Sequence, residues 1–141
     1  MTSRSTELNN YFKLKTKIKL ISADIMFLKN CKIHSVFPKF MKVTTSKNCK
    51  NSESIIKVAK NKWLESEIKN FYANRNKLEI KAYNLHLKLT KNLNNFEFIE
   101  WSVFENKMYN VINHKFLNKL KSQNNKFKQL IPKNMELKST S

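Results

Sequence analysis

The first apolar pattern in the chain runs from about residue 7 to residue 32. Its apolar side chains recur at alternating steps of three and four residues, which is the spacing of a heptad seam along one side of an α-helix. The members of this seam are Tyr11, Leu14, Ile18, Ile21, Ile25 and Leu28. We therefore predict a helix over 7–32, with Ser5 or Thr6 as its cap and Glu7 in its first turn.

A second and longer seam predicts a helix from about residue 52 to residue 92, which Ser52 or Ser54 would cap. Arg75 interrupts this seam, either as a polar residue that sets the register with a partner helix or as a local phase shift. A pattern of this length without a breaker favours an extended coiled-coil hairpin over globin-like packing. The seam consists of Leu64, Ile68, Phe71, Arg75, Leu78, Ala82, Leu85 and Leu89.

An apolar stripe predicts a third helix over 96–130. Asn94 stands three residues before Glu97, which resembles a capping box with asparagine as the cap. The stripe comprises Trp101, Phe104, Met108, Val111 or Ile112, Phe116 and Leu120. The three patterns predict an all-α protein, built as an elongated antiparallel helical hairpin or three-helix coiled coil. We expect one helical domain over 1–131, followed by a disordered tail over 132–141.

The segment between the first two predicted helices breaks the helical pattern. Pro38 cannot continue a helix, and it restricts Phe37 to extended geometry. The first part of this linker is too apolar for a solvated connection, so we expect it to lie against the helices. Its apolar members are Val36, Phe37, Phe40, Met41 and Val43.

The chain contains no glycine and only two prolines. Tight primed hairpin turns and the glycine loops that cradle phosphates both depend on glycine, so neither a Walker-type nor a dinucleotide-binding site is expected. A turn that needs a positive φ must then use asparagine or aspartate, and asparagine is abundant.

Charge adds information about partners. Lys and Arg number 28 against 10 Asp and Glu, so the formal net charge is +18 and the isoelectric point is near 10.0. A field of this sign attracts nucleic acid or acidic membranes. An alternative stays open, because lysine and asparagine have A/T-rich codons and base-composition drift alone would raise their share. Glutamate is encoded just as easily in such a genome, yet acidic residues are scarce.

Lysines gather on all three predicted helices and are the candidate nucleic-acid contacts. Lysine meets phosphate as a point charge and does not read bases by itself, so we expect binding to the DNA or RNA backbone without sequence specificity. The alternative is a solvated lysine face. The candidates are Lys13, Lys15, Lys17 and Lys19 on the outer face of the first helix, Lys57, Lys60 and Lys62 at the start of the second, and Lys115, Lys119 and Lys121 late in the third.

Cys31 and His34 have the spacing of half a zinc site. Structural zinc needs four ligands, usually as two close pairs, and the remaining Cys49, His86 and His114 supply no second pair. We therefore interpret this stretch as a helix end and predict no metal site. We also predict no catalytic residues and no cofactor, because no acids, bases or nucleophiles converge; His86 is interpreted as a residue at a solvent edge.

The sequence also bears on location. Two cysteines do not make a disulfide scaffold in a chain of 141 residues, and the polar start MTSRSTELNN does not resemble a secretory signal. No run approaches the roughly 18 apolar residues of a membrane span. We expect an intracellular protein of the nucleus or cytoplasm, neither secreted nor membrane-spanning.

Two stretches resemble the N-terminal helical region that precedes the reverse transcriptase in some invertebrate retroelement polyproteins. The stretch DIMFLKNCKIHSVFPKFMKV matches it at Phe27, Leu28, Cys31, Pro38, Lys39 and Phe40, and the stretch LHLKLTKNL matches it at Leu85, His86, Leu87 and Leu93. The resemblance covers roughly residues 8–131 and implies no catalytic residues. Asp24 is the only aspartate, so the Tyr-x-Asp-Asp motif of the polymerase is missing.

These observations lead to two main hypotheses about function; peripheral membrane attachment by the basic first helix is a third, but that helix lacks Trp and its heptad seam suits protein partners better than lipid. The first is a non-enzymatic basic helical module, a detached N-terminal region of a retroelement polyprotein that binds nucleic-acid backbone. The second is a structural or self-associating coiled-coil protein whose lysines only face solvent. In either case the apolar seams permit a homo-oligomer.

Overall fold

The computed structural model describes residues 3–37 and 52–131, which form three long α-helices: α1 (Ser3–Ile33), α2 (Ser52–Thr90) and α3 (Asn95–Leu130). The all-α class is confirmed, and no strand occurs in these two ranges. The helix α1 begins earlier than predicted, so Ser5 and Thr6 lie inside it and do not cap it. A contact with α2 explains the additional turn, because Nη1 of Arg4 lies 3.4 Å from the carbonyl oxygen of Leu89 and donates a hydrogen bond to it.

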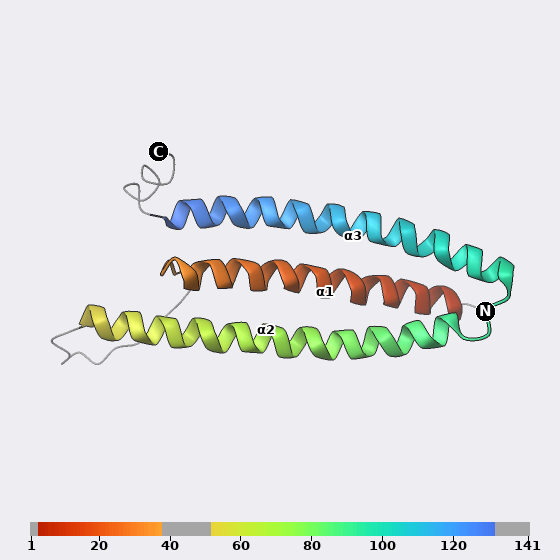
Figure 1. Cartoon of the computed structure of the whole chain (residues 1–141), viewed down its shortest axis with the longest axis horizontal. Helices are drawn as coiled ribbons and strands as arrows, with labels where there is room; N and C mark the ends of the chain where they lie inside the picture. Colours follow the sequence, from red (N-terminus) through yellow and green to blue (C-terminus); the bar gives the residue numbers. More distant parts are fainter. Residues whose placement is uncertain (1–2, 38–51, 132–141) are drawn as a thin grey trace.

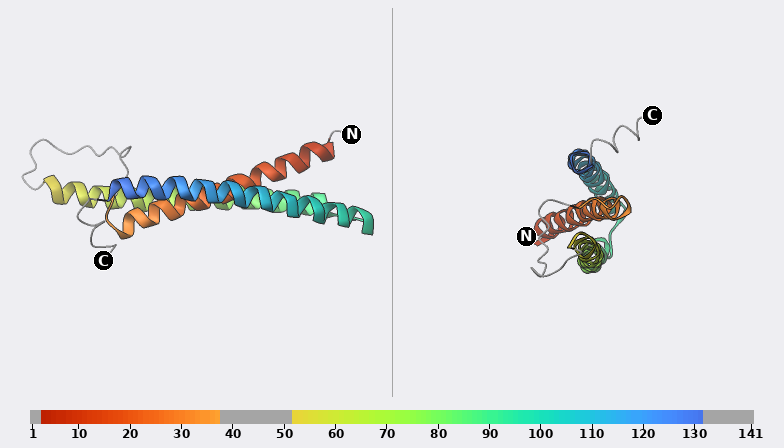
Figure 2. Two further views of the ribbon diagram at one scale, coloured as in Figure 1. Left: turned by 90° about the horizontal axis from the view of Figure 1, so that it is seen from above. Right: turned by 90° about the vertical axis from the view of Figure 1, so that its left-hand side faces the viewer.

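The three helices form an open layer with α1 in the middle (Figures 1 and 2). The helix α1 packs along both of its neighbours, whereas α2 and α3 make few direct contacts. The chain reverses after α1 and again after α2, so α1 and α2 are antiparallel and α1 and α3 are parallel (Figure 1). The predicted hairpin is therefore the α1–α2 pair, and α3 lies on the far side of α1.

Two residues of α1 show that this helix contacts both of its neighbours through different faces. Ser22 accepts a hydrogen bond from Arg75 of α2, and Asp24 forms an ion pair with Lys119 of α3. A step of two residues turns an α-helix by about 200°, so these side chains leave α1 on nearly opposite sides. A central helix needs two such contact faces, whereas the single seam read from the sequence describes only one.

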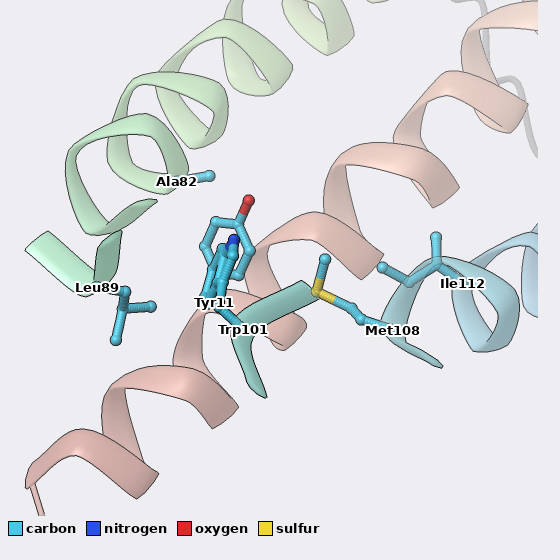
Figure 3. Packing of buried hydrophobic residues seen from close by; sticks show 6 residues of the cluster. All are labelled: Tyr11, Ala82, Leu89, Trp101, Met108 and Ile112. Carbon is cyan, nitrogen blue, oxygen red and sulfur yellow. The ribbon is translucent and has the colours of Figure 1, made fainter. Parts of the chain in front are cut away.

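One hydrophobic core lies near the turn that joins α2 to α3 (Figure 3). All three helices contribute to it, and the seams predicted from the sequence supply its members. In the third helix Ile112 is buried and Val111 is exposed, which settles the choice that the stripe left open. The buried members of the cluster are Tyr11, Ala82, Leu89, Trp101, Met108 and Ile112.

A second core lies around the C-terminal end of α1. Leu28 and Cys31 of α1 are buried against Leu64 of α2, and partly buried aromatic residues surround them. Phe37 belongs to this group and Val36 is buried, so the start of the linker does lie against the helices. The rest of the predicted apolar linker, including Pro38, lies outside the described residues, as does the predicted tail.

Arg75 keeps its place on the α2 seam. Its side chain is partly buried, and Nη1 donates a hydrogen bond to Ser22 Oγ over 3.1 Å. The guanidinium lies 4.8 Å from the ring centroid of Tyr72, and Nε lies 3.9 Å from a carboxylate oxygen of Glu79. Arg75 thus links α2 to a defined position on α1, as a register-setting residue would.

The end of α1 is a Schellman motif. The backbone N–H of Val36 donates to the carbonyl of Cys31, and the N–H of Ser35 donates to that of Lys32. Ser35 has a φ of 52°, so the prediction that only asparagine or aspartate would take a positive φ is wrong here. Burial of Val36 beside Cys31 offsets the cost of the left-handed conformation.

The turn between α2 and α3 uses asparagine as predicted. Asn92 has a φ of 57° and ends α2. Asn94 caps α3, because its Oδ1 accepts a hydrogen bond from the backbone N–H of Glu97 over 2.8 Å. This short connection reverses the chain, so α3 runs antiparallel to α2 on the other side of α1.

Candidate nucleic-acid interface

The four lysines at alternate positions in α1 do not share one outer face. Lys13 and Lys17 line a groove with α2, whereas Lys15 and Lys19 lie over aromatic rings of α3. Steps of two residues place neighbouring lysines on opposite sides of the helix, while steps of four return to the same side. The predicted cluster is therefore two pairs with different surroundings.

The groove between α1 and α2 brings together four lysines. Lys13 and Lys17 come from the N-terminal half of α1, and Lys81 and Lys88 come from the C-terminal half of α2. All four side chains are exposed. The depression has a volume of about 590 Å³, and its remaining lining residues are Asn10, Leu14, Asn84 and Leu85. Leucines form its floor, and amide and ammonium donors stand on both of its sides.

One acidic side chain balances part of this charge. Lys88 Nζ lies 2.6 Å from Oε1 of Glu7, so this lysine also fastens the start of α1 to the end of α2. Lys13, Lys17 and Lys81 line the same groove from exposed positions. Ammonium groups placed on two facing helices attract an extended anion more strongly than scattered lysines do, because their potentials add over the groove.

The other α1 pair holds α1 against α3. The Nζ atom of Lys15 lies 5.8 Å from the ring centroid of Tyr109, and that of Lys19 lies 4.7 Å from the ring of Phe116. Lys115 of α3 makes the reciprocal contact, 5.4 Å from the ring of Phe12. These distances suit cation–π attraction, so we assign these three lysines to packing between the helices.

The remaining candidates have varied surroundings. Lys119 forms an ion pair with Asp24 and also donates a hydrogen bond to the Leu20 carbonyl oxygen, so it belongs to the α1–α3 contact. Lys60 lies over the ring of Phe37 at 5.2 Å. Lys62 and Lys121 are exposed, and the Lys57 side chain lies outside the described part of the chain.

The sequence reasoning missed Lys81 and Lys88. A periodic signal was nevertheless available, since polar residues recur along α2 at steps of three and four, on a face distinct from the apolar seam. That polar series is Asn70, Asn74, Lys77, Lys81, Asn84 and Lys88. Its position beside Lys13 and Lys17 depends on the pairing of α1 with α2, which the series alone does not reveal.

His86 does not lie at a solvent edge as interpreted from the sequence. Its ring is partly buried, and the centroid of that ring lies 6.1 Å from the centroid of the Tyr11 ring and 5.5 Å from that of Trp101. The Nδ1 atom of His86 has no hydrogen-bond partner among the described residues.

Burial raises the pKa of Tyr11, which packs beside His86, and the nearby Tyr109 and Glu105 raise it further. Tyr11 therefore stays protonated and acts as a packing residue of this cluster.

The Cys31 and His34 side chains do not converge. Cys31 is fully buried and burial raises the pKa of its thiol to about 11, whereas His34 is exposed with its ring 5.4 Å from that of Phe127. Within residues 3–37 and 52–131, no three side chains of His, Cys, Asp or Glu lie together as metal ligands would.

None of the described helices is both long enough and apolar enough to cross a membrane.

No protein-family model matches the chain, and neither the curated proteins nor the solved structures contain a match to it. The interpretation of the basic groove therefore rests on its own geometry and charge.

Proposed function

We propose that this protein is a non-enzymatic helical module that binds the phosphate backbone of DNA or RNA in the groove between α1 and α2. The observation that carries the proposal is the meeting of Lys13, Lys17, Lys81 and Lys88 across that groove. A net charge of +18 supports it, because long-range attraction would bring a polyanion to this face. Binding through lysine contacts to phosphate would not discriminate between sequences.

The experiment is a fluorescence anisotropy titration with labelled single-stranded and duplex oligonucleotides over a range of salt concentrations. Three to four neutralised phosphates give a slope of log affinity against log salt of roughly −3 to −4 on duplex. Replacing Lys13, Lys17 and Lys81 by glutamate should remove most of this slope. Lys88 is left unchanged because a glutamate there would repel Glu7.

A matched control separates the groove from total charge. Lys69, Lys107 and Lys128 are exposed residues outside the groove, and their replacement by glutamate lowers the net charge by the same amount. We expect this variant to keep most of the wild-type affinity. Equal losses in the two variants would reject the groove, and a wild type that does not bind at low salt would reject nucleic-acid binding altogether.

The resemblance to the helical region before a retroelement reverse transcriptase extends the proposal. A backbone-binding module of this kind would hold nucleic acid beside a polymerase, and we place it inside the cell, in the nucleus or cytoplasm. The genomic neighbourhood tests this part. A reverse-transcriptase reading frame directly downstream of the gene would support it, and the consistent absence of such a frame would leave the module without this origin.

Self-association is the second candidate function, and exposed apolar residues favour it. At the start of α3, Phe96, Ile99 and Val103 are exposed by 69%, 60% and 48%, and they lie on the side away from the core. The exposed Glu100 stands among them, so this apolar surface with an acidic residue complements the basic remainder of a second copy.

Analytical ultracentrifugation tests the second candidate. We expect a dimer or larger species at micromolar concentration, and replacement of Ile99 by aspartate should shift it towards monomer. The exposed Asn118 lies about four turns beyond this surface on the same helix and offers a control position, where aspartate should leave the distribution unchanged. A wild type that is strictly monomeric over the whole range would reject self-association.

A further inference from the structure

An apolar pocket lies away from the basic groove, over the C-terminal half of α1. All three helices contribute to its wall, and its volume is about 480 Å³. Its apolar lining residues are Phe27 and Leu28 of α1, Trp63 and Phe71 of α2 and Leu130 of α3. A pocket of this size and lining is within the range of sites that hold small organic molecules.

Two polar residues of this wall, Asp24 and Gln123, are held in one orientation, and Glu67, Lys126 and Gln129 are its other polar residues. Asp24 accepts a hydrogen bond from Lys119 Nζ through Oδ2 and one from Gln123 Nε2 through Oδ1, over 2.9 and 2.6 Å. The carboxylate can only accept hydrogen bonds, so the amide of Gln123 must present its nitrogen to Asp24. Its carbonyl oxygen is therefore directed away from that contact.

This carbonyl oxygen is a buried acceptor without a partner. Gln123 is only 9% exposed, and its Oε1 accepts no hydrogen bond from any group in the described part of the chain. A buried polar atom left unsatisfied is unfavourable, typically by about 1–3 kcal/mol. Gln123 lines the apolar pocket while its Oε1 lies just beneath the wall, so a small shift of the side chain would present this acceptor to a ligand.

We propose that this pocket binds a small aromatic molecule that carries a single O–H or N–H donor. The aromatic body would lie against Phe27, Trp63 and Phe71, and its donor would bond to Oε1 of Gln123. The Asp24 oxygens are already engaged by α3, and the opposite charges of Glu67 and Lys126 in the lining balance each other, so the site favours a neutral donor over a second cation. This binding is independent of the basic groove and of nucleic acid.

Two probes of nearly the same shape test the proposal: 2-naphthol, which has a hydroxyl donor, and 2-methylnaphthalene, which has a methyl group in its place. Equilibrium dialysis against the full-length protein measures both affinities. The methyl compound is the more apolar, so burial alone would make it bind at least as tightly. A hydrogen bond to Gln123 reverses this order, and we expect 2-naphthol to bind about tenfold more tightly.

Matched variants locate the effect. Gln123→Met keeps the length of the side chain but removes the acceptor, so the preference for 2-naphthol should disappear. Gln129→Met makes the same chemical change at an exposed residue of the same pocket and should retain the preference. Leu130→Trp fills the pocket from its α3 side and should weaken the binding of both probes.

Several outcomes would overturn the proposal. These are the lack of saturable binding of either probe, equal or reversed affinities for the pair, and a preference that survives Gln123→Met in a variant that folds normally by circular dichroism. If Gln123→Met does not fold, the ratio of the two affinities in the wild type and the effect of Leu130→Trp still decide the question.

Discussion

Asp24 of α1 and Lys119 of α3 form an ion pair, with 2.9 Å between Oδ2 and Nζ. Gln123, one helical turn after Lys119, bonds to the other oxygen of the same carboxylate. The two α3 residues thus hold the only aspartate in the chain between them. Because α3 has few contacts with α2, it is attached to the rest of the molecule by this polar contact, by the cation–π contacts with α1 and by the apolar cores.

Asp24→Asn should therefore loosen α3. The substitution keeps the shape of the side chain but removes the charge that both α3 donors meet, and about a third of the Lys119 side chain is exposed. We expect the free energy of unfolding to fall by about 1–2 kcal/mol, measured by urea denaturation. Glu65→Gln breaks the more exposed ion pair with Lys32 and should cost less than about 0.5 kcal/mol. Equal costs would contradict a special role for Asp24.

Stability should fall in alkaline solution, partly because of Cys31. Burial raises the pKa of its thiol from 9.0 to about 11 in the folded protein. Between these values the unfolded chain releases a proton that the folded chain retains, so the free energy of unfolding decreases as pH rises through this window. The contribution is complete below about pH 9 and is lost above about pH 11.

Denaturation curves between pH 8 and pH 11 test this linkage. Cys31→Ala removes the thiol and should flatten the decrease, although the smaller side chain lowers stability at every pH. Leu28→Ala is a control in the same core, and it should lower stability without changing the pH dependence. A wild-type slope that both variants retain would contradict the assignment to Cys31.

Removal of metal should leave the protein unaffected. Cys31 is buried in the second core, whereas His34 lies on the surface beside Phe127. The two side chains therefore belong to the end of α1 and are not placed as a pair of metal ligands. A structural zinc ion contributes directly to folding, and its removal would lower the melting temperature. We expect the same melting temperature with and without EDTA. A decrease that added zinc reverses would show that Cys31 and His34 do bind metal.

Local patterns predicted the elements of this fold well. The α2 seam from Leu64 to Leu89 is buried or partly buried throughout, and Asn94 caps α3 as its spacing with Glu97 indicated. These features depend on residues within a few turns of one another. The open layer could not be read in the same way, because one heptad seam does not reveal that α1 has a second neighbour.

The site residues were predicted less well for the same reason. Lys119 was a candidate for phosphate contact, yet it meets Asp24, which is 95 residues away in the chain. Lys81 was not a candidate, yet it lies across the groove from Lys13. Whether a lysine faces solvent, a ring or a carboxylate depends on which helix packs beside it, and that pairing is a long-range property.

The two lysine pairs of α1 should respond differently to charge reversal. Lys13 and Lys17 line the groove, so their replacement by glutamate should reduce nucleic-acid affinity and make the salt slope shallower by about 2 while helicity and stability change little. Lys15 and Lys19 lie over Tyr109 and Phe116, and the same replacement there loses two cation–π contacts. We expect that variant to lose about 1 kcal/mol of stability or more.

Each double variant is the other's control, because both change the net charge equally on the same helix. Anisotropy titrations give the salt slope, and urea denaturation followed by circular dichroism gives the stability. The expected result is a crossed pattern, in which the first pair mainly affects binding and the second mainly affects unfolding. If both pairs reduce binding alike and leave stability unchanged, the lysines of α1 act only through total charge and the division between α2 and α3 has no functional consequence.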